Sequence, residues 1–322
     1  MNTFKNILLV IEPHTDEQIG LNQALTLVDP NNAKITIAAV VENTNNASRL
    51  SDTINEKQAK LASYAKGIEA HDVSIEIRVL VGRAFSEIIL DVINNERDLV
   101  IKPVEPRKPG YKLFAGTDIK LLRKCPCPVL LVRQNISSRF QTVVAAVDVD
   151  SLNPENDLLS GQILALANSV ATRNSSQYHI VHAWQIDNED YLRSSRTGLS
   201  YPELEQLRNN ERAHRKAKIT KWADNHASDN LTNGQLNSPQ LCLRNGPARN
   251  EIPGFLRDVN ADLIVMGTVA RTGIPGFFIG NTAEEILNQV SCSVFALKPA
   301  GFVSPVATKQ TSPQPAKLRS VI

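Results

Sequence analysis

The stretch GTVARTGIPGFFIGNTAEEIL, residues 267–287, sets the expectation for the whole chain. The apolar run of residues 263–266 leads into Gly267 and predicts a buried strand. Further glycines and a proline then predict an irregular loop that closes at Gly280. A helix is predicted next, with Thr282 as its cap and Glu285 completing a capping box. Its apolar positions recur at helical spacing: Ala283, Ile286, Leu287 and Val290.

Two interpretations of this stretch are open on the residues alone. A strand, a glycine loop and a helix N-terminus together can hold an anion, because glycines let the backbone approach a ligand and the first helical amides have no intrahelical partner. Arg271 would then add a charged donor. In the other interpretation the stretch is an ordinary strand-to-helix crossover, in which glycine and proline only shape the turn.

The chain contains an internal repeat. Gly82 and Gly246 stand the same number of residues before an acid, Asp98 and Asp262 respectively. The apolar residues between them also correspond: Ile88 to Ile252 and Val92 to Leu256. Shared spacing and shared element order indicate two copies of one unit.

Strands and helices alternate in both copies, which predicts an α/β fold with two tandem, doubly wound, five-stranded parallel-sheet domains. Strands are predicted at residues 7–11, 34–41, 73–81, 98–101, 128–132, 142–147, 177–184, 241–244 and 263–266. Helices in the first copy are predicted at residues 53–68, 85–92 and 117–124, the last with Asp118 as its cap. We expect domains at residues 1–134 and 141–300, packed together as an internal pseudo-dimer, and a flexible tail at residues 301–322.

Composition excludes several classes of protein. A chain of 322 residues with 42% hydrophobic and 21% charged residues is typical of a soluble protein of two domains. A net charge of +2 argues against nucleic-acid binding. The apolar run at residues 7–11 is too short for the core of a signal peptide, so we expect none. The sequence has no apolar run long enough to span a membrane and no disulfide framework among its four cysteines. We therefore expect a cytoplasmic protein.

The glycine-rich loop resembles the nucleotide loop of universal stress proteins, in which three spaced glycines are followed by Ser or Thr. Gly267 and Gly280 occupy the first and third glycine positions. Ala270 stands at the second, and Asn281 at the position of Ser or Thr. The resemblance extends over nearly the whole chain and is closest to the tandem type of the family, through the segments NILLVIEP, DLVIK, LLRKCPCPVLLV and ARTGIPGFFIGNTAEEIL.

The resemblance implies the same five-stranded fold, which is like that of adenine nucleotide alpha hydrolases, and a nucleotide site in the second copy. The acid after the first strand, which contacts the adenosine end in nucleotide-binding members, corresponds to Asp148 here and to Glu12 in the first copy. Ala183 would lie near the base, at the end of the second strand. The phosphate side would be lined by Met266, Gly267, Val269, Ala270, Gly280, Asn281 and Thr282.

From this resemblance we expect a non-catalytic stress-response protein that binds a small ligand, ATP or another nucleotide or a nucleotide-containing metabolite, in its second copy. A homodimer of the tandem chain is also compatible with it. One alternative is a weak nucleotide hydrolase, for which Asp148 and Asp150 are the nearby candidates for a base or a metal ligand. Another is an interaction scaffold whose two sites are both vestigial.

The first copy departs further from the family pattern. Pro103 replaces the glycine that corresponds to Gly267, and proline has no amide hydrogen to donate. Pro106 and Pro109 stiffen the loop that follows. We therefore expect no nucleotide site there, although the basic residues of this region leave a weak anion site open: Lys102, Arg107, Lys108 and Lys112.

Other features are given structural interpretations. His182, at a strand end, is expected to pack or to form hydrogen bonds locally. Cys125-Pro-Cys127 lacks the spacing of a redox or zinc motif and is expected to be buried. The basic run of residues 208–221 is diluted by acids and is expected to form a solvated helix face. The second copy also has an insertion around residues 185–206, either a lid over the ligand site or a longer loop and helix start.

Overall fold

The computed structural model describes residues 4–12, 17–29, 33–66, 73–105, 113–114, 116–134, 139–150, 154–186, 200–230, 239–268 and 279–306. We call residues 4–134 the first half and residues 139–306 the second half. The elements of the first half are β1 (Asn6–Ile11), α1 (Glu17–Leu27), β2 (Lys34–Val41), α2 (Ala47–Lys66), β3 (Ser74–Val81), α3 (Ala84–Asn94), β4 (Leu99–Pro103), α4 (Thr117–Lys124) and β5 (Val129–Val132). Those of the second half are β6 (Thr142–Ala146), α5 (Pro154–Asn174), β7 (Gln177–Trp184), α7 (Tyr201–Asn230), β8 (Gln240–Asn245), α8 (Ala248–Asp258), β9 (Leu263–Gly267), α9 (Asn281–Leu287) and β10 (Ser293–Leu297).

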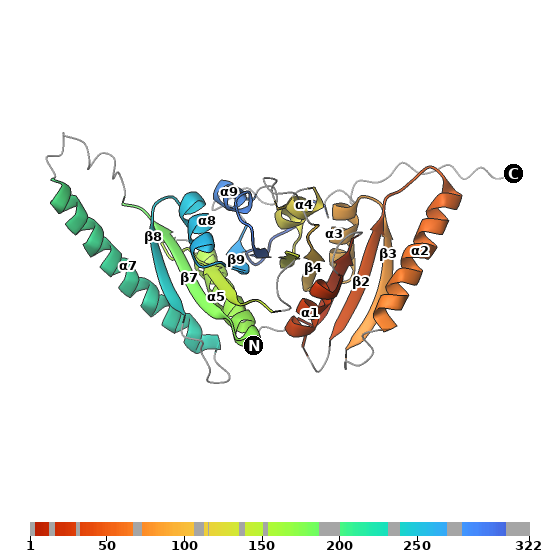
Figure 1. Cartoon of the computed structure of the whole chain (residues 1–322), viewed down its shortest axis with the longest axis horizontal. Coiled ribbons are helices and arrows are strands. Elements are labelled where there is room, and N and C mark those ends of the chain that lie inside the picture. Colours follow the sequence, from red (N-terminus) through yellow and green to blue (C-terminus); the bar gives the residue numbers. More distant parts are fainter. Residues whose placement is uncertain are drawn as a thin grey trace.

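One sheet runs through both halves, in the strand order β3-β2-β1-β4-β5-β10-β9-β6-β7-β8. Strands within each half are parallel. The halves meet where β5 and β10 pair antiparallel, with Leu130 opposite Phe295. This pairing places equivalent strands of the two copies side by side about an approximate twofold axis (Figure 1). The predicted α/β fold and internal pseudo-dimer are confirmed.

The helices form a layer on each face of the sheet. One hydrophobic cluster lies between the sheet and α1, α2, α5 and α7, and the other lies between the sheet and α3, α4, α8 and α9. Strands such as β1 are apolar throughout, since residues 7–10 are fully buried between the two layers. The helices α2 and α7 lie at the two outer ends of the molecule (Figure 1).

The repeat seen in the sequence has a structural basis. The Asp98 carboxylate accepts hydrogen bonds from the backbone amides of Lys5 and Asn6, at 2.6 and 3.0 Å. The Asp262 carboxylate likewise accepts from the amides of Gln141 and Thr142, at 2.7 and 3.1 Å. The matched glycines 82 and 246 share an unusual backbone, with φ of +144° and +146°, which only glycine adopts readily. Each copy therefore uses the same acid and the same turn to position its strands.

Two predictions about helix starts in the first half are wrong. The helix expected at residues 53–68 begins at Ala47, because Asn46 accepts a hydrogen bond from the Arg49 amide at 3.0 Å and caps an earlier turn. Asp118 does not cap α4, whose N-cap is Gly116. The Asp118 carboxylate instead turns inward, where it forms a buried ion pair.

Candidate functional site

A cavity of about 1010 Å³ lies at the carboxyl ends of the second-half strands. This edge of a doubly wound sheet is where ligands usually bind. The cavity is formed by the ends of β6, β7 and β9, the starts of α8 and α9, and side chains of α5 and α7. We call it the second-half cavity.

The second-half cavity brings together residues that the sequence places far apart. Its lining includes every described member of the predicted site: Asp148, Ala183, Met266, Gly267, Gly280, Asn281 and Thr282. The other three predicted residues, Val269, Ala270 and Arg271, lie outside the described residues. Binding by all of these residues stays a prediction.

The predicted capping box at the start of α9 is wrong. Gly280 is the N-cap, and no side chain caps the helix. The Gly280 amide donates to the Thr268 carbonyl at 3.1 Å, which returns the chain to the end of β9. Thr282 is therefore the second residue of the helix, and it lines the cavity.

Gly267 has a role in packing that does not depend on a ligand. A Cβ atom at this position would lie 2.9 Å from Cδ2 of Leu159 in α5, which is closer than side chains normally approach. Glycine therefore lets α5 pack closely over the end of β9. Sequence reasoning considered ligand approach and turn shape for the glycines of this stretch, but not helix packing.

A polar cluster centred on Asp150 borders the cavity, and the sequence did not reveal it. The Asp150 carboxylate lies 3.1 Å from His182 Nε2 and 3.3 Å from Lys218 Nζ, and it forms an ion pair with Arg215. The hydrogen bond from His182, followed by the charges of His182 and Arg215, holds the pKa of Asp150 well below its usual range. Asp150 is therefore an ion-pair partner, poorly suited to act as a general base near neutral pH.

His182 has the local structural role expected for it. Its Nδ1 donates to the Val147 carbonyl at 3.1 Å, and its other ring nitrogen faces Asp150. The side chain is only 2% exposed. His182 thus links the end of β7 to the segment that follows β6, through its contacts with Val147 and Asp150.

The helix that follows the insertion, α7, contributes to the cavity. This helix has 30 residues, against 20 in α2 of the first half. Arg215 of α7 lines the cavity, and its guanidinium carbon lies 5.3 Å from the centre of the Trp184 ring. Residues 187–199 of the insertion lie outside the described residues, so the lid interpretation stays a prediction. The contact of Arg215 with a ring at a strand end had no signal in the sequence.

At the corresponding edge of the first half, a lysine side chain is buried between two acids. Lys102, which corresponds to Met266, is 1% exposed. Its ammonium lies 2.8 Å from a carboxylate oxygen of Glu12 and 2.8 Å from one of Asp118. These two acids stand at the positions of Asp148 and Thr282. We call these three residues the first-half triad.

The charges within the first-half triad satisfy one another. Burial alone would lower the pKa of Lys102, but the negative charges of Asp118 and Glu12 outweigh it and raise that pKa. Burial raises the pKa of Glu12, even though Lys102 opposes the shift. The sequence left a weak anion site open here with Lys102 as a contributor. That role is wrong, because its ammonium is buried and already paired with two carboxylates. The other basic residues proposed for it, Arg107, Lys108 and Lys112, lie outside the described residues.

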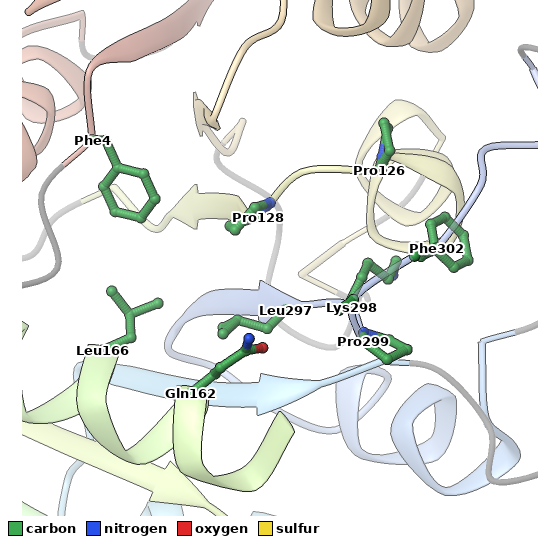
Figure 2. Close-up of a pocket in the computed structure, with 11 residues that line it drawn as sticks. Phe4, Pro126, Pro128, Gln162, Leu166, Leu297, Lys298, Pro299 and Phe302 are labelled. Carbon is green, nitrogen blue, oxygen red and sulfur yellow. The ribbon is translucent and has the colours of Figure 1, made fainter. Parts of the chain in front are cut away.

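A second hollow, of about 430 Å³, lies where the two halves meet (Figure 2). Phe4, Pro126 and Pro128 of the first half line it together with residues of α5 and the segment after β10. Lys298 also lines it, but its ammonium contacts the Leu122 carbonyl and the Thr268 hydroxyl, and so joins the halves. The hollow contains none of the predicted site residues.

The remaining features do not form a metal or redox centre within the described part of the chain. No group of three or more His, Cys, Asp and Glu residues there could hold a metal ion. Cys125 and Cys127 are buried thiols whose sulfur atoms lie 3.6 Å apart, as their expected burial implied. Among the described helices, none is both long and apolar enough to cross a membrane.

Comparisons with known proteins agree with the duplicated fold. The profile of the Universal stress protein family matches residues 3–133 and again residues 139–298. The chain is 26% identical over 323 residues to Universal stress protein E of Photorhabdus laumondii, covering 95% of this chain and 98% of that one. It is also 26% identical over 326 residues to Universal stress protein E of Escherichia coli, again covering 95% of this chain and 98% of that one.

Two solved structures share the fold over nearly the full length. A functionally unknown protein from Pseudomonas aeruginosa superposes with a TM-score of 0.72 at 24% identity, covering 95% of this chain and 96% of that one. A universal stress protein from Archaeoglobus fulgidus superposes with a TM-score of 0.61 at 17% identity, covering 91% of this chain and 98% of that one. At these identities the likeness concerns the fold.

Proposed function

The chain belongs to the universal stress protein family, and from that premise we propose that its second half binds a nucleotide or a nucleotide-containing metabolite without catalysing its breakdown. In this proposal the protein is a cytoplasmic stress-response protein. Ligand binding is confined to the second half.

The observation that carries this proposal is the difference between the two strand-end edges. In the second half the predicted residues surround a cavity of about 1010 Å³. In the first half the equivalent positions hold the first-half triad, whose buried lysine is paired with two carboxylates. Ligand sites are typically about 300–1,000 Å³, so the second-half cavity has room for a whole nucleotide.

The polarity of the cavity supports the proposed orientation of the ligand. Asp148 lines the cavity, and its carboxylate can accept hydrogen bonds from ribose hydroxyls. Asn281 and Thr282 lie on the side where the family holds phosphate, and both side chains can donate hydrogen bonds to phosphate oxygens. Hydrolysis would require a water-activating base, and Asp150 is already held by three basic side chains.

Isothermal titration calorimetry of the purified chain with ATP, ADP and a UDP-sugar tests the proposal. We expect one site per chain for at least one of them. Asp148→Ala should weaken binding about tenfold, which corresponds to the loss of about 1.4 kcal/mol of binding free energy. The matched control is Glu12→Ala at the equivalent first-half position, and it should leave the affinity unchanged. Absence of binding by all three nucleotides, or weakening by Glu12→Ala alone, would overturn the proposal.

A further inference from the structure

Helix α7 and strand β7 bring a cation and an aromatic ring together at the second-half cavity. Trp184 is the last residue of β7, and the Arg215 guanidinium lies over its ring, 5.3 Å from the centre. Both residues line the cavity, as does Ala183, which the family resemblance places near the base. In the first half, Val41 ends the equivalent strand β2, so the position of Trp184 is held by an aliphatic side chain.

The orientation of the guanidinium is fixed by two carboxylates. Arg215 Nε lies 2.7 Å from an oxygen of Glu211, and its Nη1 forms an ion pair with Asp150. Bonds of this kind lie at the edge of the guanidinium plane. The Trp184 ring lies beside the group, with its centre 5.3 Å from the guanidinium carbon. The Arg215 side chain is 18% exposed, and this accessible part lines the cavity.

The Trp184 ring is nearly enclosed where it lines the cavity. Its side chain is 4% exposed, and its indole N–H has no hydrogen-bond acceptor within the described part of the chain. That nitrogen is itself inaccessible to solvent, so the ring contributes to the cavity through its packing against Arg215 and not through this donor.

We propose that Arg215 is a specificity-determining residue of the second-half cavity, where its guanidinium, backed by Trp184, forms a flat shelf for the aromatic base of the ligand. The inference rests on the proposed nucleotide site and narrows its ligand class. Flat rings stack on arginine planes as well as on aromatic side chains, and the contact tolerates any base. The site should therefore prefer nucleotides over phosphate compounds that lack a base.

The test compares ATP with tripolyphosphate by calorimetry in the wild type and in single variants. Wild type should bind ATP at least tenfold more tightly than tripolyphosphate. Arg215→Ala should weaken ATP binding about tenfold and leave tripolyphosphate binding unchanged. Arg215→Lys retains the charge but not the flat face, so it should remain as weak as Arg215→Ala for ATP. Lys218→Ala is the matched control, since Lys218 also pairs with Asp150, at 3.3 Å, whereas the cation over the Trp184 ring is Arg215.

Fluorescence gives an independent measurement of where the base lies. The chain has two tryptophans, so Trp222→Phe leaves Trp184 as the only indole reporter. ATP should change the emission of Trp184 in this variant, and tripolyphosphate should not. Thermal unfolding of each variant checks that it is folded.

The outcomes separate this inference from the proposed function. ATP binding that is indifferent to Arg215→Ala overturns the shelf and leaves the nucleotide site intact. Equal weakening of ATP and tripolyphosphate by Arg215→Ala also overturns it, because Arg215 would then contact phosphate. If wild type binds neither compound, the nucleotide site and the shelf are both overturned.

Discussion

The strand-end edges of the two halves show how one duplicated backbone can be kept open or filled. In the first half, Lys102 extends from the end of β4 and pairs with Glu12 and Asp118 inside the protein. In the second half, Met266 occupies the same strand position and the space beside it belongs to a cavity. Met266 belongs to one of the two hydrophobic clusters, whereas Lys102 is buried through its two ion pairs. The comparison indicates that a binding edge can be lost by satisfying its polar groups internally.

The same edges differ in how helix and strand approach each other. Pro103 at the end of β4 packs against Gly20 of α1, whose Cβ, if present, would lie 2.9 Å from Pro103 Cγ. In the second half, the glycine is on the strand and the larger residue, Leu159, is on the helix. Each half therefore places a small residue opposite a bulky one, with the roles exchanged. A glycine at this edge is consequently no sign of a ligand by itself.

The largest expected effect comes from removing the lysine of the first-half triad. Lys102→Met gives the first half the residue of the second, but it leaves Glu12 and Asp118 buried without their cation. Breaking a buried pair in this way costs about 3–5 kcal/mol of the free energy of unfolding, to be measured by urea denaturation. Adding Glu12→Gln and Asp118→Asn should restore part of the loss. A cost below about 1 kcal/mol for Lys102→Met alone would contradict the tight pairing described here.

A smaller effect is expected from filling the helix glycine of the first half. A Cβ added by Gly20→Ala would lie 2.8 Å from Leu9 Cδ1 and 2.9 Å from the rigid Pro103 ring. We expect a loss of about 1–2 kcal/mol in urea denaturation, because overpacking exceeds the gain in helix propensity. Gly267→Ala is the matched second-half variant and should cost less, since it meets the end of a flexible leucine. Equal costs would show that the two edges are packed alike.

Acid conditions should reveal the cluster around Asp150. Its pKa in the folded state lies below the unfolded value, so Asp150 stabilises the protein above about pH 4 and this contribution is lost as the pH falls. Asp150→Asn should therefore be less stable than wild type at pH 7 and lose less of its stability between pH 6 and pH 3, measured by urea denaturation. In the first half, a hydrogen bond from Lys34 lowers the pKa of Glu76 to about 2, so Glu76→Gln should flatten the acid profile in the same direction. Identical acid profiles for wild type and Asp150→Asn would exclude the proposed ion pairing.

The smallest effect is expected from the ion pair that joins the halves beside the two edges. Arg123 of α4 pairs with Glu284 of α9, and more than a third of each side chain is exposed. The double-mutant cycle of Arg123→Ala and Glu284→Ala should give a coupling of about 0.2–1 kcal/mol that decreases in high salt. A larger, salt-independent coupling energy would contradict the solvent-screened pairing expected from the exposure of these two side chains.

The sequence predicted the fold well because local patterns carry it. Apolar runs give the strands, and the matched Gly82 and Gly246, followed by Asp98 and Asp262, give the duplication. Errors arose where a short polar residue near a helix start has two possible partners. Asp118 has the position expected of a cap, but its carboxylate pairs with the buried Lys102. Thr282 is inside its helix, because the N-cap is Gly280, two residues earlier.

The candidate site was only partly predictable for a different reason. The described residues among those carried over from the family pattern line the cavity, since parallel strands end at a common edge. The ion pair between Asp150 and Arg215 joins residues that are far apart in the sequence, and no periodic pattern links them. Likewise, Lys102 was interpreted from the sequence as a contributor to a weak anion site, because its pairing with Glu12 and Asp118 is visible only in the structure. Pairings of this kind depend on tertiary structure.

The antiparallel junction of β5 and β10 has a consequence for the order in which the protein is made. Strand β5 ends at Val132, but the strand that covers its edge begins only at Ser293. During synthesis the first half therefore emerges with β5 as an apolar edge strand, paired with β4 on one side and unpaired on the other. Unpaired strand edges of this kind recruit other chains. The ribosome must deliver almost the entire second half before that edge is covered. A nascent chain halted before β10 would be a candidate for chaperone capture, even though its first half already contains all five of its own strands.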